Sequence, residues 1–243
     1  MRVMDIEADR PKAVIVGTGG HAQVLWAAWQ TLQNTPGQVS PLLMGWLEHA
    51  GYQGPTHLMD LPVYPETEAG LLALSEQGVW AFYFGIGMVT ANPKRWDIFQ
   101  RVQGYGFTPK TLIHPTAVVD SSAIIGPGCF IGARSVIQPF VKLGAAAIVN
   151  TGSIVEHHAD MGQNVHVAPG SILCGHSQVG DHSLIGAGAI VLQQVSVGRL
   201  AAVGAGSVVL QSVAEGATVV GNPARPVLQG HNRNQMGQES VVS

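Results

Sequence analysis

The sequence predicts a small Rossmann-like α/β domain over residues 12–110, followed by a left-handed parallel β-helix over residues 111–228. Two observations predict this fold class. In the first half, short apolar runs alternate with segments of helical spacing, which is typical of a parallel sheet covered by helices. From residue 112 onward, the chain divides into six-residue blocks without an insertion. The remaining residues, 1–11 and 229–243, are predicted to form an N-terminal tail and a flexible C-terminal tail.

The elements of the α/β domain follow from its apolar runs and turn residues, which predict a small sheet of three or four strands. Three runs predict buried parallel strands, at residues 13–16, 42–47 and 79–86. Three segments predict helices, at residues 20–32, 66–77 and 93–103. Pro93 suits the start of the third helix, and Gly104 suits its end.

The second half repeats every six residues over 17 blocks, from Leu112 to Val213. The second position is always Ile, Val, Leu or Met, and the last is always Ala, Ser, Cys or Val. One block supplies a short strand and a turn, so three blocks close a triangular coil of 18 residues with its aliphatic side chains inside. Stacked coils form a solenoid, whereas the turns of an irregular β-sandwich would drift in spacing. Gly is frequent at the third position, where it is expected for backbone angles that other residues avoid.

The same period predicts contacts between successive coils. His158 and His176 are one coil apart, so their Cα atoms are expected about 5 Å from each other, which is the spacing of neighbouring strands. A metal site at this pair is disfavoured because no third ligand is evident, and no metal is predicted. Cys129 and Cys174 are too few for a disulfide framework or a thiolate metal site.

Composition and charge argue against several classes of function. Asp, Glu, Lys and Arg make up 11% of the residues, and the net charge is −3 without a basic run, which argues against nucleic-acid binding. No apolar stretch reaches the roughly 18 residues of a membrane span. The first residues lack the apolar core of a signal peptide. The sequence therefore predicts a cytoplasmic protein without a nucleic-acid or membrane partner.

A glycine-rich turn follows the first predicted strand. Residues 17–22 read Gly-Thr-Gly-Gly-His-Ala, which fits GxGxxA between a strand and a helix. This pattern is typical of a dinucleotide site with phosphates at the helix N-terminus. NAD binding would favour an acid at the tip of the second strand, where Glu48 stands. An NAD-dependent enzyme is nevertheless disfavoured, because the sheet is small and the domain holds no second catalytic constellation.

Four motifs in order resemble the hexapeptide-repeat sugar acyltransferases: VIVGTGGHA, LIHPTAVV, NTGSIVEHH and VVGNPAR. The resemblance covers about residues 12–228. Within the family, the chain most resembles the branch that contains sialic acid O-acetyltransferases and UDP-amino-sugar N-acetyltransferases. It implies a homotrimer with active sites between neighbouring β-helices. It also implies acetyl-CoA in the groove between subunits and a nucleotide sugar on the N-terminal domain.

The resemblance assigns roles to particular residues. It implies His157 as the catalytic base, and histidine suits this role because its pKa lies near neutrality. The family usually has a carboxylate directly after this residue, where His158 stands here, so Glu156 or His158 is expected to support the base. The residues implied for acetyl-CoA are His166, Ala187 and Ala205. The residues implied for the substrate are Gly19, Gly20, His21, Glu48, His49, Gly87 and Asn150, with Glu48-His49 where the family commonly has two Asp.

The expected reaction is N-acetylation of a UDP-linked amino sugar by acetyl-CoA as co-substrate, for polysaccharide or glycan synthesis. His157 would take the proton from the attacking amine, and no acyl-enzyme is required. O-acetylation of a sialic acid or a related sugar by the same residues is the alternative. A non-catalytic scaffold that keeps the β-helix is a less favoured hypothesis of a different class, and it would consume no acetyl-CoA.

Overall fold

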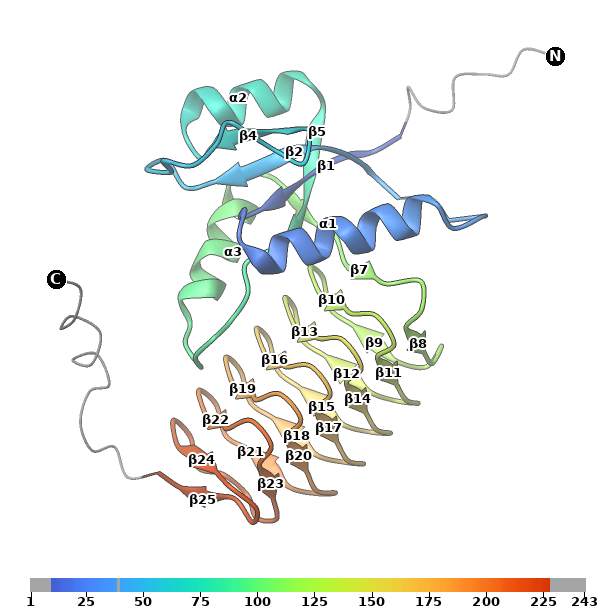
Figure 1. Ribbon diagram of the computed structural model, residues 1–243, viewed down its shortest axis with the longest axis vertical. Coiled ribbons are helices and arrows are strands. Elements are labelled where there is room, and N and C mark those ends of the chain that lie inside the picture. Colours follow the sequence, from blue (N-terminus) through green and yellow to red (C-terminus); the bar gives the residue numbers. More distant parts are fainter. Residues whose placement is uncertain (1–9, 39, 228–243) are drawn as a thin grey trace, which may run out of the picture.

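The structure is a computed structural model that describes residues 10–38 and 40–227. An α/β domain sits at one end of a long, three-sided β-helix, and α3 extends beside the first coils (Figure 1). The predicted tails fall outside the described residues, apart from Arg10 and Pro11 at the end of the first one. None of the described helices is long and apolar enough to cross a membrane.

The α/β domain is built on a six-stranded sheet with the order β3-β4-β2-β1-β5-β6. Its strands are β1 (Lys12–Val16), β2 (Leu42–Glu48), β3 (His57–Leu58), β4 (Leu61–Pro65), β5 (Val79–Phe84) and β6 (Thr108–Pro109). Its helices are α1 (Gly20–Gln33), α2 (Glu68–Glu76) and α3 (Lys94–Gly104). Neighbouring strands are parallel except in the β3–β4 hairpin.

The prediction of three or four strands in this sheet is wrong, because β3, β4 and β6 add to the three strands found from apolar runs. Two of the missed strands have only two residues, and β4 contains two prolines, so none of them shows an apolar run. The three predicted helices are present, with ends that shift by a residue or two. Pro93 is the N-cap of α3 rather than its first helical residue.

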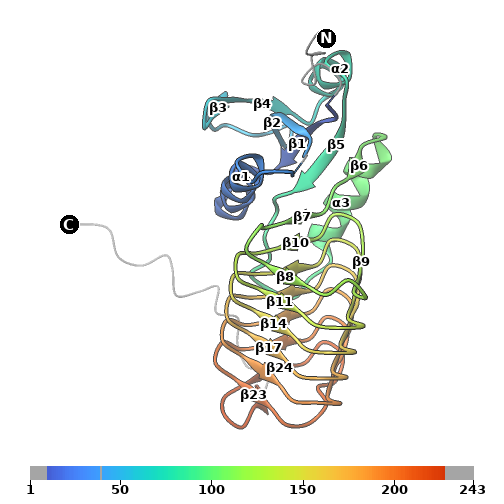
Figure 2. The ribbon, with the colours of Figure 1, turned by 90° about the vertical axis from the view of Figure 1, so that its right-hand side faces the viewer.

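The second half forms the predicted stack of triangular coils, with a two-residue strand on each side (Figure 2). The first face holds β7 (Leu112–Ile113), β10 (Phe130–Ile131), β13 (Ile148–Val149), β16 (His166–Val167), β19 (Leu184–Ile185), β22 (Ala202–Val203), β24 (Thr218–Val220) and β25 (Arg225–Pro226). The second face holds β8 (Val118–Val119), β11 (Val136–Ile137), β14 (Ile154–Val155), β17 (Ile172–Leu173), β20 (Ile190–Val191) and β23 (Val208–Val209). The third face holds β9 (Ile124–Ile125), β12 (Lys142–Leu143), β15 (Asp160–Met161), β18 (Gln178–Val179) and β21 (Ser196–Val197).

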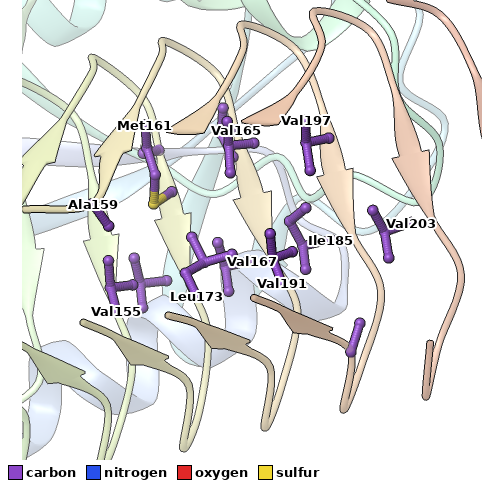
Figure 3. Packing of buried hydrophobic residues seen from close by; sticks show 14 of the residues in the cluster. Val155, Ala159, Met161, Val165, Val167, Leu173, Ile185, Val191, Val197 and Val203 are labelled. Carbon is purple, nitrogen blue, oxygen red and sulfur yellow. The ribbon is translucent and has the colours of Figure 1, made fainter. Parts of the chain in front are cut away.

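The interior of the β-helix is filled by the second residue of each block from Val119 to Val209, together with last-position residues such as Ala159 and Val165 (Figure 3). Val155, Leu173 and Val191 follow one another through successive coils and are fully buried. Burying each such side chain contributes about 1.5–3 kcal/mol. The last position of the block is small because it is buried at a corner. A serine there can bond to the backbone, as Ser153 does by donating through Oγ to the carbonyl of Ala168 at 2.9 Å.

Glycine is frequent at the third block position for a different reason than the predicted one. A Cβ on Gly144 would lie 2.5 Å from the backbone of Gly162 and Gln163 in the next coil, so glycine is needed for space. The left-handed backbone lies instead at the fifth position, for example at Gly170 and at His158, which has a φ of 60°. The backbone-angle interpretation of the third position is therefore wrong, and the angle constraint belongs two residues later.

The two domains share apolar cores and a buried cation. Leu112, Phe130 and Ile148 of the first face pack into the core beneath β1 and α1. Arg95 of α3 is 3% exposed, and its guanidinium donates to the carbonyl of Ala146 at 2.6 Å. These contacts fix the α/β domain against the first face of the β-helix.

Candidate active site

His157 lies at the corner between the second and third faces, in the turn that joins β14 to β15. Its ring is exposed, and its Nδ1 is 3.2 Å from Nδ1 of His158. Because a hydrogen bond between these atoms needs one proton, one ring donates and the other accepts. When His157 donates through Nδ1, its Nε2 carries a lone pair and can act as a base.

Gly175 provides the space for the His157 ring. It stands 18 positions after His157, at the same place in the next coil. A Cβ on Gly175 would lie 2.7 Å from both Cε1 and Nε2 of His157, which is closer than real Cβ atoms come. The imidazole therefore rests on the backbone of the next coil, and only glycine at residue 175 leaves it in this place.

His158 and His176 stack in register on successive coils. Their rings are 4.6 Å apart with an interplanar angle of 13°. The strands beside them pair Asp160 with Gln178, which confirms the predicted 18-residue register. Desolvation, together with the nearby His176 and His157, lowers the pKa of His158, so a neutral ring is favoured.

The two residues expected to support the base have different positions. His158 contacts the ring of His157, as described above. Glu156 makes no side-chain hydrogen bond within the described part of the chain, and its carboxylate lies near Cys174 in the next coil, where burial and then Glu156 raise the pKa of the thiol. Of the two, His158 is the one whose side chain hydrogen-bonds to the His157 ring.

A second group of the predicted residues meets where the α/β domain covers the first face. His166 is the first residue of β16 and is 8% exposed. Its Nδ1 donates to the carbonyl of Met88 at 2.9 Å, and its Nε2 is 3.3 Å from Nδ2 of Asn150, which donates to it. Burial lowers the pKa of His166 to about 4, so this ring is neutral with its proton on Nδ1.

His21, in the first turn of α1, lies beside this group. Its ring centroid is 6.4 Å from that of His166 and 5.3 Å from that of Phe130. Burial, followed by the positive charge of Arg95, lowers the pKa of His21 to about 3. A Cβ on Gly87 would lie 3.2 Å from the Cβ of His21, so Gly87 lets the chain after β5 pass close to α1.

The glycine-rich turn is open on one side. Within the described residues, a Cβ built on Gly19 or Gly20 would meet no atom within 4 Å apart from the adjoining residues and the backbone of α1. Gly19 is the N-cap of α1 and provides no side-chain cap, so N–H groups of the first turn remain for an anion. Oε2 of Glu48 accepts from the N–H and the hydroxyl of Thr18, at 3.0 and 2.9 Å, while His49 is exposed.

Ala187 and Ala205 lie at the corner between the first and second faces. Both are exposed, and they are one coil apart, with the N–H of Gly206 donating to the carbonyl of Ala187 at 2.8 Å. Two small residues in line leave this stretch of the corner flat. It is not the corner that carries His157.

The sequence and the fold are similar to known acyltransferases. The family described as "Hexapeptide repeat of succinyl-transferase" matches residues 122–156 and 178–211. The acetyltransferase domain of PglB from Neisseria gonorrhoeae is 32% identical, with 90% of this chain and 100% of that chain covered and a TM-score of 0.77. PerB from Caulobacter crescentus, solved with CoA and GDP-perosamine, is 30% identical, with 89% and 97% covered and a TM-score of 0.78. No curated protein matches the sequence.

This chain belongs to the hexapeptide-repeat sugar acyltransferases. WeeI from Acinetobacter baumannii shares the fold as well, with a TM-score of 0.70 at 24% identity, and the match covers 88% of this chain and 99% of that chain. The predicted fold class, an α/β domain followed by a left-handed β-helix, is therefore confirmed. The prediction of an acyltransferase is likewise confirmed, and the non-catalytic scaffold is set aside.

The structure of this hexapeptide-repeat acyltransferase brings some of the predicted residues together and separates others. His21, Gly87, Asn150 and His166 meet at the domain junction. His157 does not join them, because β15 on the third face lies between its corner and β16. A single chain therefore holds the expected base at one place, and three expected substrate residues with the expected acetyl-CoA residue His166 at another.

Sequence reasoning missed several contributors in this acyltransferase. The carbonyl of Met88, which fixes the tautomer of His166, is a backbone group and has no signature in the sequence. The expectation that no third metal ligand stands beside His158 and His176 is wrong, because the ring of His157 lies within reach of both. The 18-residue period contained the signal: Gly175 is the residue below His157, so the His157 ring turns toward His176.

Proposed function

We propose that this acyltransferase transfers an acetyl group from acetyl-CoA to the amine of a nucleotide-linked sugar, with His157 as the general base. The observation that carries the proposal is the exposed His157 ring, which is oriented through Nδ1 by His158. Within the described residues, no group hydrogen-bonds its Nε2. The similarity to a perosamine N-acetyltransferase that was solved with CoA and GDP-perosamine supports an amine as the acceptor.

The reaction needs one proton to move from the amine to the leaving sulfur. The neutral amine attacks the thioester carbonyl, the new N–C bond forms, and Nε2 of His157 accepts the amine proton. The C–S bond then breaks, and the imidazolium returns this proton to the sulfur to give free CoA and the N-acetyl sugar. A general base of this kind accelerates such a step by about 10²–10⁴-fold.

His158 is proposed as a positioning residue. Its Nδ1 accepts the Nδ1–H of His157, which keeps the lone pair of the neutral His157 ring on Nε2, and the same hydrogen bond is retained when Nε2 has taken the proton. A carboxylate at this place would add a negative charge beside the imidazolium, and a neutral His158 adds none. This enzyme would therefore keep the orientation of the base without the electrostatic contribution of a carboxylate.

A second copy of the chain is proposed to complete the site. The base lies at one corner, and the buried group around His166 and Asn150 lies on another face, so one chain does not bring them to one substrate. A homotrimer with its β-helices side by side would place the His157 corner of one chain against the first face of the next. Acetyl-CoA would then lie along the flat corner at Ala187 and Ala205.

The nucleotide is proposed to bind at the glycine-rich turn of the α/β domain. Gly19 and Gly20 leave room for phosphates at the uncapped start of α1, and Glu48 is held at the tip of β2, near the expected ribose. UDP stays a prediction, because PerB was solved with GDP-perosamine. A cytoplasmic location also stays a prediction.

An acceptor screen tests the function directly. Release of free thiol from acetyl-CoA is followed with amino sugars linked to UDP and to GDP, the same sugars without nucleotide, and sialic acid. We expect turnover with one nucleotide-linked amino sugar and none with the free sugar. Turnover only with sialic acid would show that the acceptor is a hydroxyl group and not an amine. The absence of turnover with any nucleotide-linked amino sugar would contradict the proposal.

A further inference from the structure

The His157 corner holds three imidazoles within reach of one ion. His157, His158 and His176 each offer a ring nitrogen, and these three atoms all lie within 4.8 Å of one another. The three side chains are exposed, and imidazole is the commonest protein ligand for transition metals. We propose that these three histidines form a binding site for a divalent transition-metal ion, with Zn²⁺ as its typical occupant.

The distance between the first two ligands already suits a metal. Nδ1 of His157 and Nδ1 of His158 are 3.2 Å apart. Two nitrogens bound to a tetrahedral Zn²⁺ at their usual Zn–N distances lie about 3.3 Å apart. The same pair of atoms can therefore share a proton in one state and a metal ion in another.

The third ligand needs only a side-chain rotation. The His176 ring is stacked on that of His158 and is edge-on to that of His157, with centroids 5.4 Å apart. The backbones are held in register, since the N–H of His176 donates to the carbonyl of His157 at 3.0 Å. The coils thus fix the three Cα positions, while the exposed rings can turn their nitrogens toward a common point.

The surroundings of the three histidines are open to an ion and include a carboxylate that attracts a cation. His158 and His176 line an open pocket of about 330 Å³ together with Phe140, Lys142 and Asp160. The carboxylate of Asp160 provides a negative charge to a cation and offsets the positive charge of Lys142. Three nitrogen ligands select Zn²⁺, Cu²⁺ or Ni²⁺ over Mg²⁺ and Ca²⁺, which prefer oxygen, and they leave a fourth position for water.

The site has a functional consequence that rests on the proposed role of His157. A metal bound at Nδ1 of His157 takes the place of the proton shared with His158, so the proton of the neutral His157 ring stands on Nε2 and no lone pair is left there to accept the amine proton. Metal and proton transfer therefore exclude each other at this corner, and Zn²⁺ is expected to inhibit acetyl transfer.

A calorimetric titration of the metal-free full chain with Zn²⁺, carried out without substrates, tests the site. We expect one ion per chain, with an affinity that falls about tenfold or more in His176→Gln. Glutamine is suited to this position, because Gln194 occupies it in the next coil with a φ of 61°. His57→Gln, which changes an exposed histidine on β3, is the matched control and should bind as the wild type does. Absence of saturable binding, or equal affinity in His176→Gln, would overturn the proposal.

A second arm separates this proposal from the proposed function. Acetyl transfer is measured in the presence of a chelator and then with added Zn²⁺, each variant relative to its own metal-free rate. We expect inhibition that needs about tenfold more Zn²⁺ in His176→Gln. Calorimetric binding without inhibition would keep the metal site and contradict His157 as the base, whereas metal-free activity without Zn²⁺ binding would contradict the site alone.

Discussion

Neighbouring side chains decide what His157 can do. Nδ1 of His158 contacts Nδ1 of the His157 ring at 3.2 Å. Gly175 lies beneath the ring and leaves room for it, because it has no Cβ. Both contacts come from the six-residue block: His158 stands at the fifth position, which adopts a left-handed backbone, and Gly175 repeats the position of His157 one coil later. Each contact can be changed while His157 itself is kept, so each gives a prediction about the orientation of the His157 ring alone.

The contribution of His158 can be measured by removing and replacing it. We expect His158→Ala to lower kcat about tenfold with little change in the KM for the sugar, because one orienting hydrogen bond is lost. We expect His158→Glu to restore kcat, since a carboxylate accepts the same hydrogen bond. Steady-state kinetics of both variants check this. Equal losses in both variants, or a loss only in KM, would show that His158 does not orient the base.

The space under the base can be removed with one methyl group. Gly175→Ala would place a Cβ 2.7 Å from Cε1 and Nε2 of His157, so the exposed ring must move. We expect kcat to fall about tenfold or more, while the melting temperature changes little because an exposed ring can move at small cost. Gly104→Ala at the end of α3, where a Cβ meets nothing within 4 Å, is the control. An unchanged kcat in Gly175→Ala would mean that the ring position has no role.

At the scale of elements, the period of the sequence determines the strands of the β-helix, and the glycines determine how closely its coils approach. The strands from β7 to β23 appear at the predicted six-residue spacing, because the blocks provide inward aliphatic side chains, from Val119 to Val209, and small corner residues. The short strands β3, β4 and β6 could not be found, because pairing with a neighbour rather than an apolar pattern makes them strands.

Two glycine substitutions distinguish space from backbone angle. Gly144→Ala would bring a Cβ within 2.5 Å of the next coil, so we expect a destabilisation of about 1–3 kcal/mol and a melting temperature several degrees lower. Gly170→Asn is the control, since Gly170 has a φ of 69° in open space and Asn164 occupies the same block position with a φ of 55°. Thermal unfolding measures both. Similar shifts in the two variants would contradict the division of roles between the third and fifth positions.

At the scale of the whole molecule, the domain junction and the His157 corner show the limits of the sequence. The 18-residue period could predict that His158 and His176 stack, and the resemblance could name His166 and Asn150. Neither could predict that the chain after β5 folds back to cover His166 with the carbonyl of Met88, because that path depends on the tertiary packing of the two domains. The separation of His157 from this junction likewise appears only once the coils are closed.

The buried histidines at the junction predict acid sensitivity. The pKa of His166 is lowered to about 4 and that of His21 to about 3, mainly by burial and also by Arg95. The unfolded chain binds these protons below pH about 6.5 and the folded chain does not, so stability is full above that pH. Stability then falls as the pH drops from 6.5 toward 4, by up to about 1.4 kcal/mol per group and pH unit.

Thermal unfolding between pH about 7 and 5 checks this prediction, with His166→Gln as the comparison. The variant should lose less stability than the wild type over this range, because one group that resists protonation is gone. Parallel pH curves for the two proteins would show that the buried His166 does not account for the acid sensitivity.

In the proposed reaction, Nε2 of His157 takes the proton of the acceptor amine. The most direct measurement is the kcat of His157→Asn for acetyl transfer to the nucleotide-linked amino sugar found by the screen, with both substrates saturating. His57→Asn serves as the matched control. The predicted result is a loss of about 10²-fold or more in His157→Asn, with acetyl-CoA binding retained and the control unaffected. Turnover near the wild-type rate in His157→Asn would show that His157 is not the base.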